Sequence, residues 1–249
     1  MKKMNKKKEE LSGPRLAALY SLMPNRLGFC GPQKNSDQGK LTKFLLDEIS
    51  EKEVRKVLSK FEAAYAYYKL IAKKNKIKDP LNIKVVEAYW LGNKLLEKVG
   101  VEDIKKMILK DFVKPNLLTR ETAIQRSALI PKNSKAHHSF HVFILGSVTG
   151  RVDFKNIKLK DICRPGWGKV ISIKNDKVLV EYEPLASEKG KIKFGKKKGK
   201  EINWDKRIVP DISVGDWVSF HWNFLAQKLK KEEIKNLTKY TKINLNHKV

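Results

Sequence analysis

The spacing of apolar residues in the first half of the chain predicts helices. Between Val54 and Ala72 apolar residues recur every three or four positions, which is the repeat of one helix face, and Ser50 with Glu53 forms a capping-box pattern just before them. Further helices are expected at residues 15–23, 41–49, 80–91, 101–113 and 118–129. Proline or glycine separates most of these segments. This half is therefore expected to be a bundle of five or six helices joined by short loops.

The second half has the pattern of strands. Short apolar runs at residues 170–173 and 178–182 flank Asn175-Asp176, a pair that tolerates positive φ, so we expect a β-hairpin there. Other strands are expected at residues 142–148 and 216–222. A lysine-rich helix with one apolar face should then follow directly, at residues 228–244. The expected fold class is α+β, with an N-terminal helical bundle followed by a small β-barrel and a C-terminal helix.

The chain is expected to contain two domains after a short tail. Residues 1–10 are mostly lysine, with no apolar segment after them, and read as a disordered basic tail rather than a signal peptide. We place a helical domain at residues 11–131 and the barrel domain at residues 137–249, joined without a long linker. No apolar run is long enough to span a membrane, and two cysteines half the chain apart make no disulfide framework, so a cytoplasmic location is expected.

The formal net charge of +27 raises the question of nucleic-acid binding. Only 8 of the 54 basic residues are arginine, the side chain that specific base and phosphate recognition favours, and the lysines are spread along every predicted helix. Any binding of nucleic acid is therefore expected to be non-specific. The candidate basic patch is formed by Lys193, Lys196, Lys197 and Lys198.

Histidine and cysteine supply the candidate metal ligands. His137, His138 and His141 cluster where the two domains meet, and two of them could bind a transition metal on either a strand or a helix. A satisfied polar network is the alternative, because no cysteine or carboxylate follows at the spacing of a zinc motif. Cys30 lies in a glycine-flanked turn, where it either packs in the core or joins the histidines.

A cleft between the domains would make an enzyme possible. Phe29, Glu87 and Trp90 are candidate pocket residues, and Cys30 with His138 and His141 contains the groups of a nucleophile–base pair or of a metal site. No spacing specifies a reaction, however. A glycine-rich phosphate loop, a Gly-x-Ser-x-Gly elbow, a Cys-x-x-Cys pair and a His-Glu-x-x-His helix are all absent from the sequence. We therefore expect a protein that is not an enzyme.

Two segments carry a resemblance to a known family. Cys163-Arg164-Pro165-Gly166 precedes the first hairpin, and Val214-Gly215-Asp216-Trp217-Val218 opens a strand that ends at His221 before Asn223-Phe224-Leu225-Ala226. This last third of the chain is similar to the HypC/HupF type of [NiFe]-hydrogenase maturation chaperones. The resemblance implies an OB-like barrel with a C-terminal helix. It also implies that Cys163 matches the family's cysteine, which helps to hold an iron centre carrying cyanide and carbon monoxide, and that His221 matches its histidine.

The whole chain also resembles an uncharacterised prokaryotic family that joins a helical domain to such a barrel. The resemblance rests on residues 28–32, 87–93 and 137–142 and brings no known activity. The chaperone resemblance implies an accessory protein that binds a metalloenzyme subunit or a maturation factor. The candidate cofactors are transient iron, through Cys163 and His221, or zinc.

Several alternatives stay open at this point. A solvent-reachable Cys163 thiolate, favoured by the neighbouring Arg164, is expected if the chaperone reading holds. An RNA-binding module would instead use the basic patch, with Trp167 or Trp204 stacking on bases. The sequence does not decide whether Cys30 and the clustered histidines share one cleft with Cys163 and His221.

Overall fold

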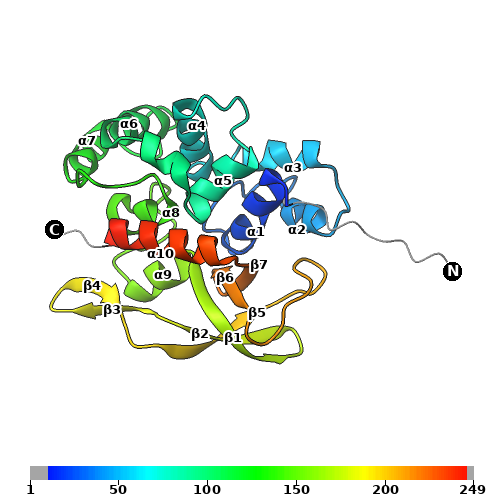
Figure 1. Ribbon diagram of the computed structural model, residues 1–249. Helices are drawn as coiled ribbons and strands as arrows, with labels where there is room; N and C mark the ends of the chain where they lie inside the picture. Colours follow the sequence, from blue (N-terminus) through cyan, green and yellow to red (C-terminus); the bar gives the residue numbers. More distant parts are fainter. Residues whose placement is uncertain (1–10, 246–249) are drawn as a thin grey trace.

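The first half of the chain is helical (Figure 1). The computed structural model describes residues 11–245, so the basic tail expected at residues 1–10 lies outside the described residues. The helices of this half are α1 (Gly13–Arg26), α2 (Lys40–Leu45), α3 (Glu51–Leu58), α4 (Ala64–Lys74), α5 (Ile83–Trp90), the 3-10 helix η1 (Lys94–Lys98), α6 (Val101–Met107), the π-helical η2 (Ile108–Phe112) and α7 (Arg120–Ala128).

The capping box at the start of α3 is confirmed. The Ser50 side chain accepts the backbone N–H of Glu53, and the Glu53 carboxylate accepts the backbone N–H of Ser50 at 3.1 Å. The single long helix expected over residues 54–72 is wrong, because the chain turns at residues 59–63 between α3 and α4. Phe61 and Ala63 stay buried through this turn, so the apolar spacing of a helix continues where the helix itself does not.

The segment between the two halves is also helical. It contains α8 (His138–Phe140), the π-helical η3 (His141–Leu145) and α9 (Ile157–Cys163). The strand expected at residues 142–148 is therefore wrong. The ring of His137 accepts the backbone N–H of Ser139 and so caps the helical turn, and Gly146 ends it with a φ of 81°.

A five-stranded sheet forms the second half of the molecule. Its strands are β1 (Gly166–Lys174), β2 (Lys177–Tyr182), β5 (Lys198–Asn203), β6 (Trp217–His221) and β7 (Phe224–Lys228), in the order β1-β2-β5-β7-β6. β1 also pairs with β6, and β5 meets β7 through the single pair Asn203–Phe224. The β1–β2 hairpin is confirmed, with Asn175 at a φ of 54° in its turn. Strands β3 (Leu185–Glu188) and β4 (Lys191–Phe194) pair separately.

The end of the sheet differs from the expected strand-to-helix junction. Trp222 and Asn223 both have positive φ and form a two-residue turn, after which β7 returns antiparallel to β6. The helix expected from residue 228 begins later, as α10 (Lys231–Leu245). The observed class is mixed α+β with a C-terminal helix, as expected.

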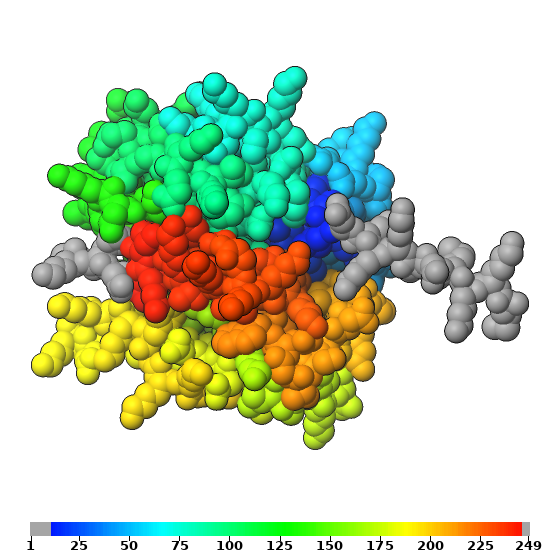
Figure 2. Space-filling model, viewed as in Figure 1, coloured from blue at the N-terminus to red at the C-terminus, as the bar shows by residue number. Residues whose placement is uncertain are grey.

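One hydrophobic core runs from the helices into the sheet. It includes Tyr89 and Phe140 on the helical side and Val180 and Phe220 in the sheet. Helix α10 runs along the boundary between the helices and the sheet (Figures 1 and 2). The division of the chain at residues 131–137 stays a prediction. Within residues 11–245, no helix has the length and apolar character needed to cross a membrane.

Gly92 is expected to be the most sensitive glycine at this boundary. It has a φ of +85°, and a Cβ added there would lie 2.1 Å from Cδ2 of the buried Tyr240 ring in α10. Gly92→Ala should therefore lower the free energy of unfolding by about 2 to 4 kcal/mol, from overpacking and from the left-handed backbone together. Gly150→Ala is the control, because Gly150 has a φ of +70° with no atom within 4 Å of the added Cβ. Equal losses in urea titrations of the two variants would contradict the packing argument.

Candidate metal centre

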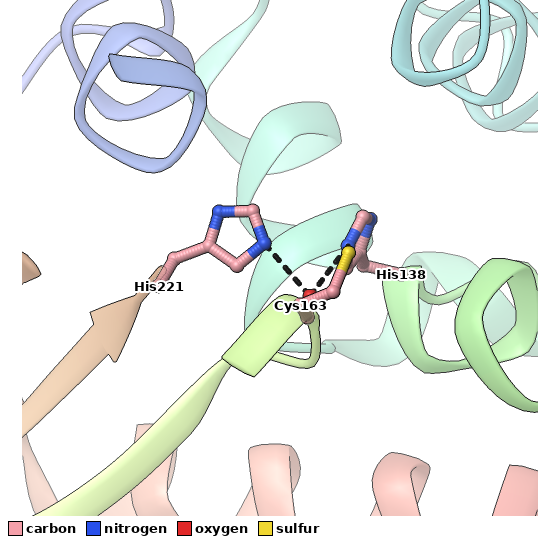
Figure 3. Close-up of side chains that lie close together, drawn as sticks. All are labelled: His138, Cys163 and His221. Atoms are coloured by element: carbon pink, nitrogen blue, oxygen red, sulfur yellow. Dashed lines mark hydrogen bonds between the residues drawn. The ribbon is translucent and has the colours of Figure 1, made fainter. Parts of the chain in front are cut away.

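Three buried side chains from separate segments meet at the junction of helices and sheet (Figure 3). His138 begins α8, Cys163 ends α9 and His221 ends β6. Their ligand atoms, two imidazole nitrogens and one sulfur, all lie within 4.8 Å of one another. A thiol and two imidazoles within this distance form a donor set suited to a transition metal.

The backbone carbonyl of Cys163 holds the two histidines in place. Nε2 of His138 lies 2.9 Å from this oxygen, and Nε2 of His221 lies 2.7 Å from it (Figure 3). The Cys163 sulfur makes only a long contact of 3.8 Å, with Nε2 of His138. The hydrogen-bonding role of Cys163 therefore belongs to its backbone, and its thiol is not needed to position either ring.

The two histidines differ in what their other ring nitrogens contact. The Tyr89 hydroxyl lies 2.8 Å from Nδ1 of His138 and can donate to it, which leaves a neutral ring with its proton on Nε2. Nδ1 of His221 lies 2.5 Å from the Tyr20 carbonyl oxygen, so both nitrogens of this ring face acceptors. A neutral imidazole donates only once. One nitrogen of a neutral His221 can therefore exchange its carbonyl contact for a metal without losing a hydrogen bond.

Burial sets the charge state of these rings. It lowers the pKa of His138 well below the usual range, with the other histidines adding to the effect, and it lowers the pKa of His221 to about 4 although its two carbonyl contacts act in the opposite direction. Both rings are therefore neutral near pH 7. Neutral imidazole is the form that binds metal ions.

The expectation of a solvent-reachable Cys163 thiolate is wrong. The residue is only 6% exposed, and burial raises the pKa of its thiol well above the usual range. Arg164 does not act on the thiol, because its guanidinium lies 3.0 Å from the Asp161 carboxylate and donates to the Glu183 carbonyl at 2.6 Å. The thiol is thus protonated at neutral pH, and a bound metal ion would have to displace that proton.

Cys163 and His221 line one cavity of about 40 Å³ together with Cys30, His138 and His141. Its wall also contains Phe29 and Trp90. The sequence left open whether these groups share a cleft, and the fold brings them to the same one. Burial, followed by the Glu62 carboxylate, raises the pKa of the Cys30 thiol to about 12.

Two polar atoms of the cavity wall have no hydrogen-bond partner among the described residues. They are Nδ1 of His141 and Nε1 of Trp222, in side chains that are 8% and 4% exposed. The indole N–H of Trp222 favours the thiolate form of Cys163, but its geometry falls short of a hydrogen bond. Burial lowers the pKa of His141 to about 4. Unpaired buried polar groups are costly, and either a water molecule or a ligand in the cavity would satisfy them.

Comparison with known proteins places the chain in a family. Residues 9–248 match a family of unknown function, DUF6390. The chain belongs to this family. No curated protein and no solved structure matches it. The matched range spans the helices and the sheet, so every residue of the cavity lies inside it.

Two other predicted site residues have different places in the fold. His137 is buried, but its Nε2 donates to the Trp90 carbonyl oxygen at 3.1 Å and its Nδ1 accepts from Ser139, so its role is to cap α8. Glu87 was expected in the pocket, but it does not line the cavity. Its carboxylate accepts the Asn93 amide at 3.2 Å and pairs with the exposed Lys84, outside the cavity.

The basic patch lies on the surface, away from the cavity. Lys193 is in β4, and Lys196, Lys197 and Lys198 follow it, all of them exposed. The stacking role expected for Trp167 and Trp204 is wrong, since their side chains are 8% and 6% exposed. A buried indole cannot stack on a base without unfolding its surroundings.

Tyr20 and Tyr89 are site residues that sequence reasoning did not identify. The contact of Tyr20 with His221 joins positions 201 residues apart, and the contact of Tyr89 with His138 joins positions 49 residues apart. Only the apolar helix pattern around them was visible in the sequence, and it predicts burial without naming a partner.

Proposed function

We propose that this protein is an accessory protein that binds a transition-metal ion, or an iron fragment, between His138, Cys163 and His221 and passes it to a partner protein. The observation that carries the proposal is the meeting of a thiol and two neutral imidazoles, from three segments, in one buried cavity. Sulfur and imidazole ligands suit iron, zinc and copper better than magnesium or calcium.

The distances in the cavity support a metal. A tetrahedral site with metal–nitrogen and metal–sulfur bonds of about 2.0 and 2.3 Å separates those two ligands by about 3.5 Å. The sulfur of Cys163 and Nε2 of His138 are 3.8 Å apart. To bind through Nε2, the His138 ring would carry its proton on Nδ1 and donate it to the Tyr89 hydroxyl, giving up its hydrogen bond to the Cys163 carbonyl. On binding, the thiol would release its proton to solvent, so affinity should rise with pH.

The resemblance to the HypC/HupF chaperones supports the accessory role. On the sequence resemblance, Cys163 and His221 match that family's cysteine and histidine, and an OB-like barrel with a C-terminal helix is the fold it implies. His138 would add a ligand from the helical segment between the two halves. The partner on this proposal is a metalloenzyme subunit or a maturation factor.

The size of the cavity favours an ion over an enzyme substrate. A volume of about 40 Å³ holds roughly three water molecules, at 10 to 15 Å³ each. An ion with one or two small ligands fits such a space, whereas a typical substrate does not.

Cys163→Ala tests the proposal without disturbing the histidines, because both rings bond to the backbone carbonyl of Cys163. Affinity for zinc, measured by competition with a chromophoric chelator under anaerobic conditions, should fall by more than about 100-fold, since even groups that only support a ligand are worth 10- to 100-fold. Ser147→Ala is the matched control, because Ser147 lines the same cavity and its substitution removes no thiol or imidazole.

Equal zinc affinity in the wild-type and Cys163→Ala proteins would contradict the proposed site. Metal analysis and infrared spectroscopy of anaerobically purified protein would identify the natural cargo. Bands of diatomic ligands on iron would support the iron fragment that the chaperone resemblance implies, and zinc without such bands would support a zinc protein.

A further inference from the structure

The loop at residues 28–33 lies over the buried thiol of the cavity. Phe29 stacks on Trp222 with ring centroids 4.4 Å apart, and Trp222 packs in the same apolar cluster as Cys163. The neighbouring Cys30 is half-buried and lines the same cavity. Cys30 is therefore the more exposed of the two cysteine residues that border this space, although burial raises the pKa of its thiol to about 12.

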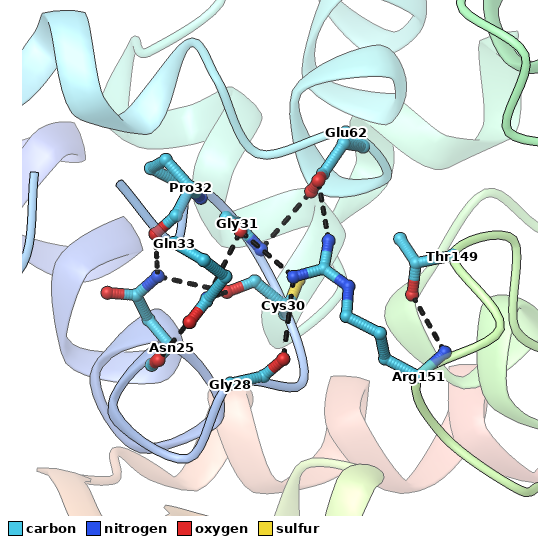
Figure 4. A network of polar contacts seen from close by, with 9 residues as sticks. All are labelled: Asn25, Gly28, Cys30, Gly31, Pro32, Gln33, Glu62, Thr149 and Arg151. Atoms are coloured by element: carbon cyan, nitrogen blue, oxygen red, sulfur yellow. Dashed lines mark hydrogen bonds and ion pairs between the residues drawn. The ribbon is translucent and has the colours of Figure 1, made fainter. Parts of the chain in front are cut away.

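An ion pair holds the backbone of this loop (Figure 4). Arg151 Nη2 lies 2.5 Å from the Glu62 carboxylate, while its Nη1 donates to the Gly31 carbonyl at 3.1 Å and to the Gly28 carbonyl at 3.4 Å. The second oxygen of Glu62 accepts the Gly31 N–H at 3.2 Å. The loop is thus fixed from outside through its peptide groups.

Asn25 fixes the same loop from α1. Its amide donates to the Cys30 and Pro32 carbonyl oxygens, both at 3.0 Å (Figure 4). None of these contacts uses the Cys30 sulfur, which has no hydrogen bond among the described residues. The surroundings position the Cys30 backbone, and the neighbouring Gly31 N–H favours the thiolate form of Cys30 without making a hydrogen bond to its sulfur.

Charge balance gives that thiol a role. A divalent ion bound by Cys163 thiolate and two neutral imidazoles would carry a net charge of +1 in a buried cavity. Glu62 already neutralises Arg151 beside Cys30, and Arg126 adds a positive charge near His141, so no nearby group within residues 11–245 balances the ion. An uncompensated buried charge is strongly unfavourable. A second thiolate makes the site neutral.

We propose that Cys30 is a second thiolate ligand to the same ion, so that the cavity binds a thiophilic divalent metal through two sulfurs and two imidazoles. The inference rests on the proposed function. Both thiols release their protons to solvent as the two metal–sulfur bonds form. The unpaired Nδ1 of His141 and Nε1 of Trp222, in the same wall, then face a ligand-filled space rather than an empty one.

The loop has to move inward for this bond to form, because Cys30 is not among the three residues whose ligand atoms lie within 4.8 Å of one another. Gly28 is the residue whose backbone can change most freely, and its contact with Arg151, together with that of Gly31, would break as the loop moves. It has a φ of +79°, and the nearest atom to its Cβ position is 3.6 Å away. Gly31 cannot serve in this way, since the Phe61 ring fills its Cβ position at 2.5 Å.

Cadmium binding tests the inference, because cadmium–thiolate bonds absorb in the ultraviolet in proportion to their number. The absorbance per bound Cd²⁺ should be about twofold higher in wild-type protein than in Cys30→Ser, which should still bind through Cys163. Gln33→Ala, in the same loop, is the control and should keep the wild-type value. Equal absorbance per ion in wild-type and Cys30→Ser would overturn the inference while leaving the proposed function standing. A Cys163→Ser variant that binds Cd²⁺ as wild type does would overturn both.

A measurement on the unaltered chain guards against a variant that fails to fold. Saturating Zn²⁺ should slow alkylation of Cys30 at least tenfold, read by mass spectrometry of the Cys30 peptide, because the thiolate lone pair is then bound to metal. Alkylation of Cys30 at an unchanged rate, with Cys163 protected, would exclude Cys30 as a ligand.

Discussion

At pH 5 the metal-free protein is expected to be roughly 6 kcal/mol less stable to unfolding than at pH 7.5. The cause is the set of buried neutral histidines. Burial lowers the pKa of His137 to about 3 and that of His141 to about 4. It also lowers the pKa of His138 well below the usual value for histidine. In the unfolded chain each ring has a pKa of about 6.5, so at pH 5 each contributes about 2 kcal/mol to the loss.

The direction of this pH dependence follows from the number of protons that the folded and unfolded chains bind. A folded-state pKa below the unfolded value means that the unfolded chain binds more protons under pH 6.5, so this stability is complete above pH 6.5 and is lost as the pH falls. Carboxylates contribute mainly below pH 5, because their unfolded pKa values are about 4. The window from pH 5 to 6.5 therefore reports on histidine. The sum counts three rings; burial also lowers the pKa of His221 to about 4, although two carbonyl oxygens face its ring, so its contribution has the same sign.

His141→Leu is the variant that checks this assignment. The Nδ1 of His141 has no partner, so the substitution strands no hydrogen bond at that atom. The average slope of the unfolding free energy against pH, from urea titrations between pH 5 and 6.5, should fall by about 1 kcal/mol per pH unit relative to wild type. A wild-type unfolding free energy that stays constant across this window would show that the histidines are not buried in neutral form.

Arg164→Ala should cost about 3 to 5 kcal/mol of stability, the usual effect of removing one partner of a buried ion pair. Arg164 is 1% exposed and lies over the rings of Trp167 and Phe194, each 5.2 Å from its guanidinium carbon. Its removal leaves the Asp161 carboxylate buried with only the Tyr182 hydroxyl and the Leu185 N–H as donors.

A double-mutant cycle separates the ion pair from simple loss of packing. Arg164→Ala combined with Asp161→Ala should cost less than the sum of the two single substitutions, because no unpaired charge remains. Arg207→Ala is a control for arginine removal, since Arg207 is exposed and pairs only with Asp205, and it should cost less than about 1 kcal/mol. Exactly additive costs at Arg164 and Asp161 would contradict the coupling.

The parts of the fold that the sequence predicted are those determined by nearby residues. The Ser50–Glu53 capping box and the Asn175 turn each act within a few residues of one another. The errors arose where an apolar run is compatible with both a helix and a strand. The apolar residues of 142–148 follow neither the helix nor the strand repeat, and the helix there depends on a cap from His137. The turn at Trp222 and Asn223 places a bulky residue at positive φ, which sequence patterns do not favour.

The candidate site could be predicted only in pieces. The chaperone resemblance paired Cys163 with His221, and local clustering singled out His138 and His141. Their meeting depends on how the helices dock on the sheet, which no short-range pattern encodes. The burial of Cys163 was missed for the same reason, since Arg164 beside it in sequence pairs instead with Asp161 and moves away from the thiol.

The carbonyl of Cys163 makes the two halves of this protein interdependent. One peptide oxygen receives a ring from α8 and a ring from β6, and the β6 ring also reaches back to α1 through Tyr20. A gene cut between residues 131 and 137 would therefore yield two fragments, neither of which contains all of these contacts. The fragment after the cut would keep His138, Cys163 and His221 but lose the Tyr89 and Tyr20 contacts that orient the two rings, so full metal affinity should return only when the fragments are mixed. Complementation of a split chain is therefore a direct assay for docking. It also means that neither half can be exchanged for an unrelated module without rebuilding the cavity.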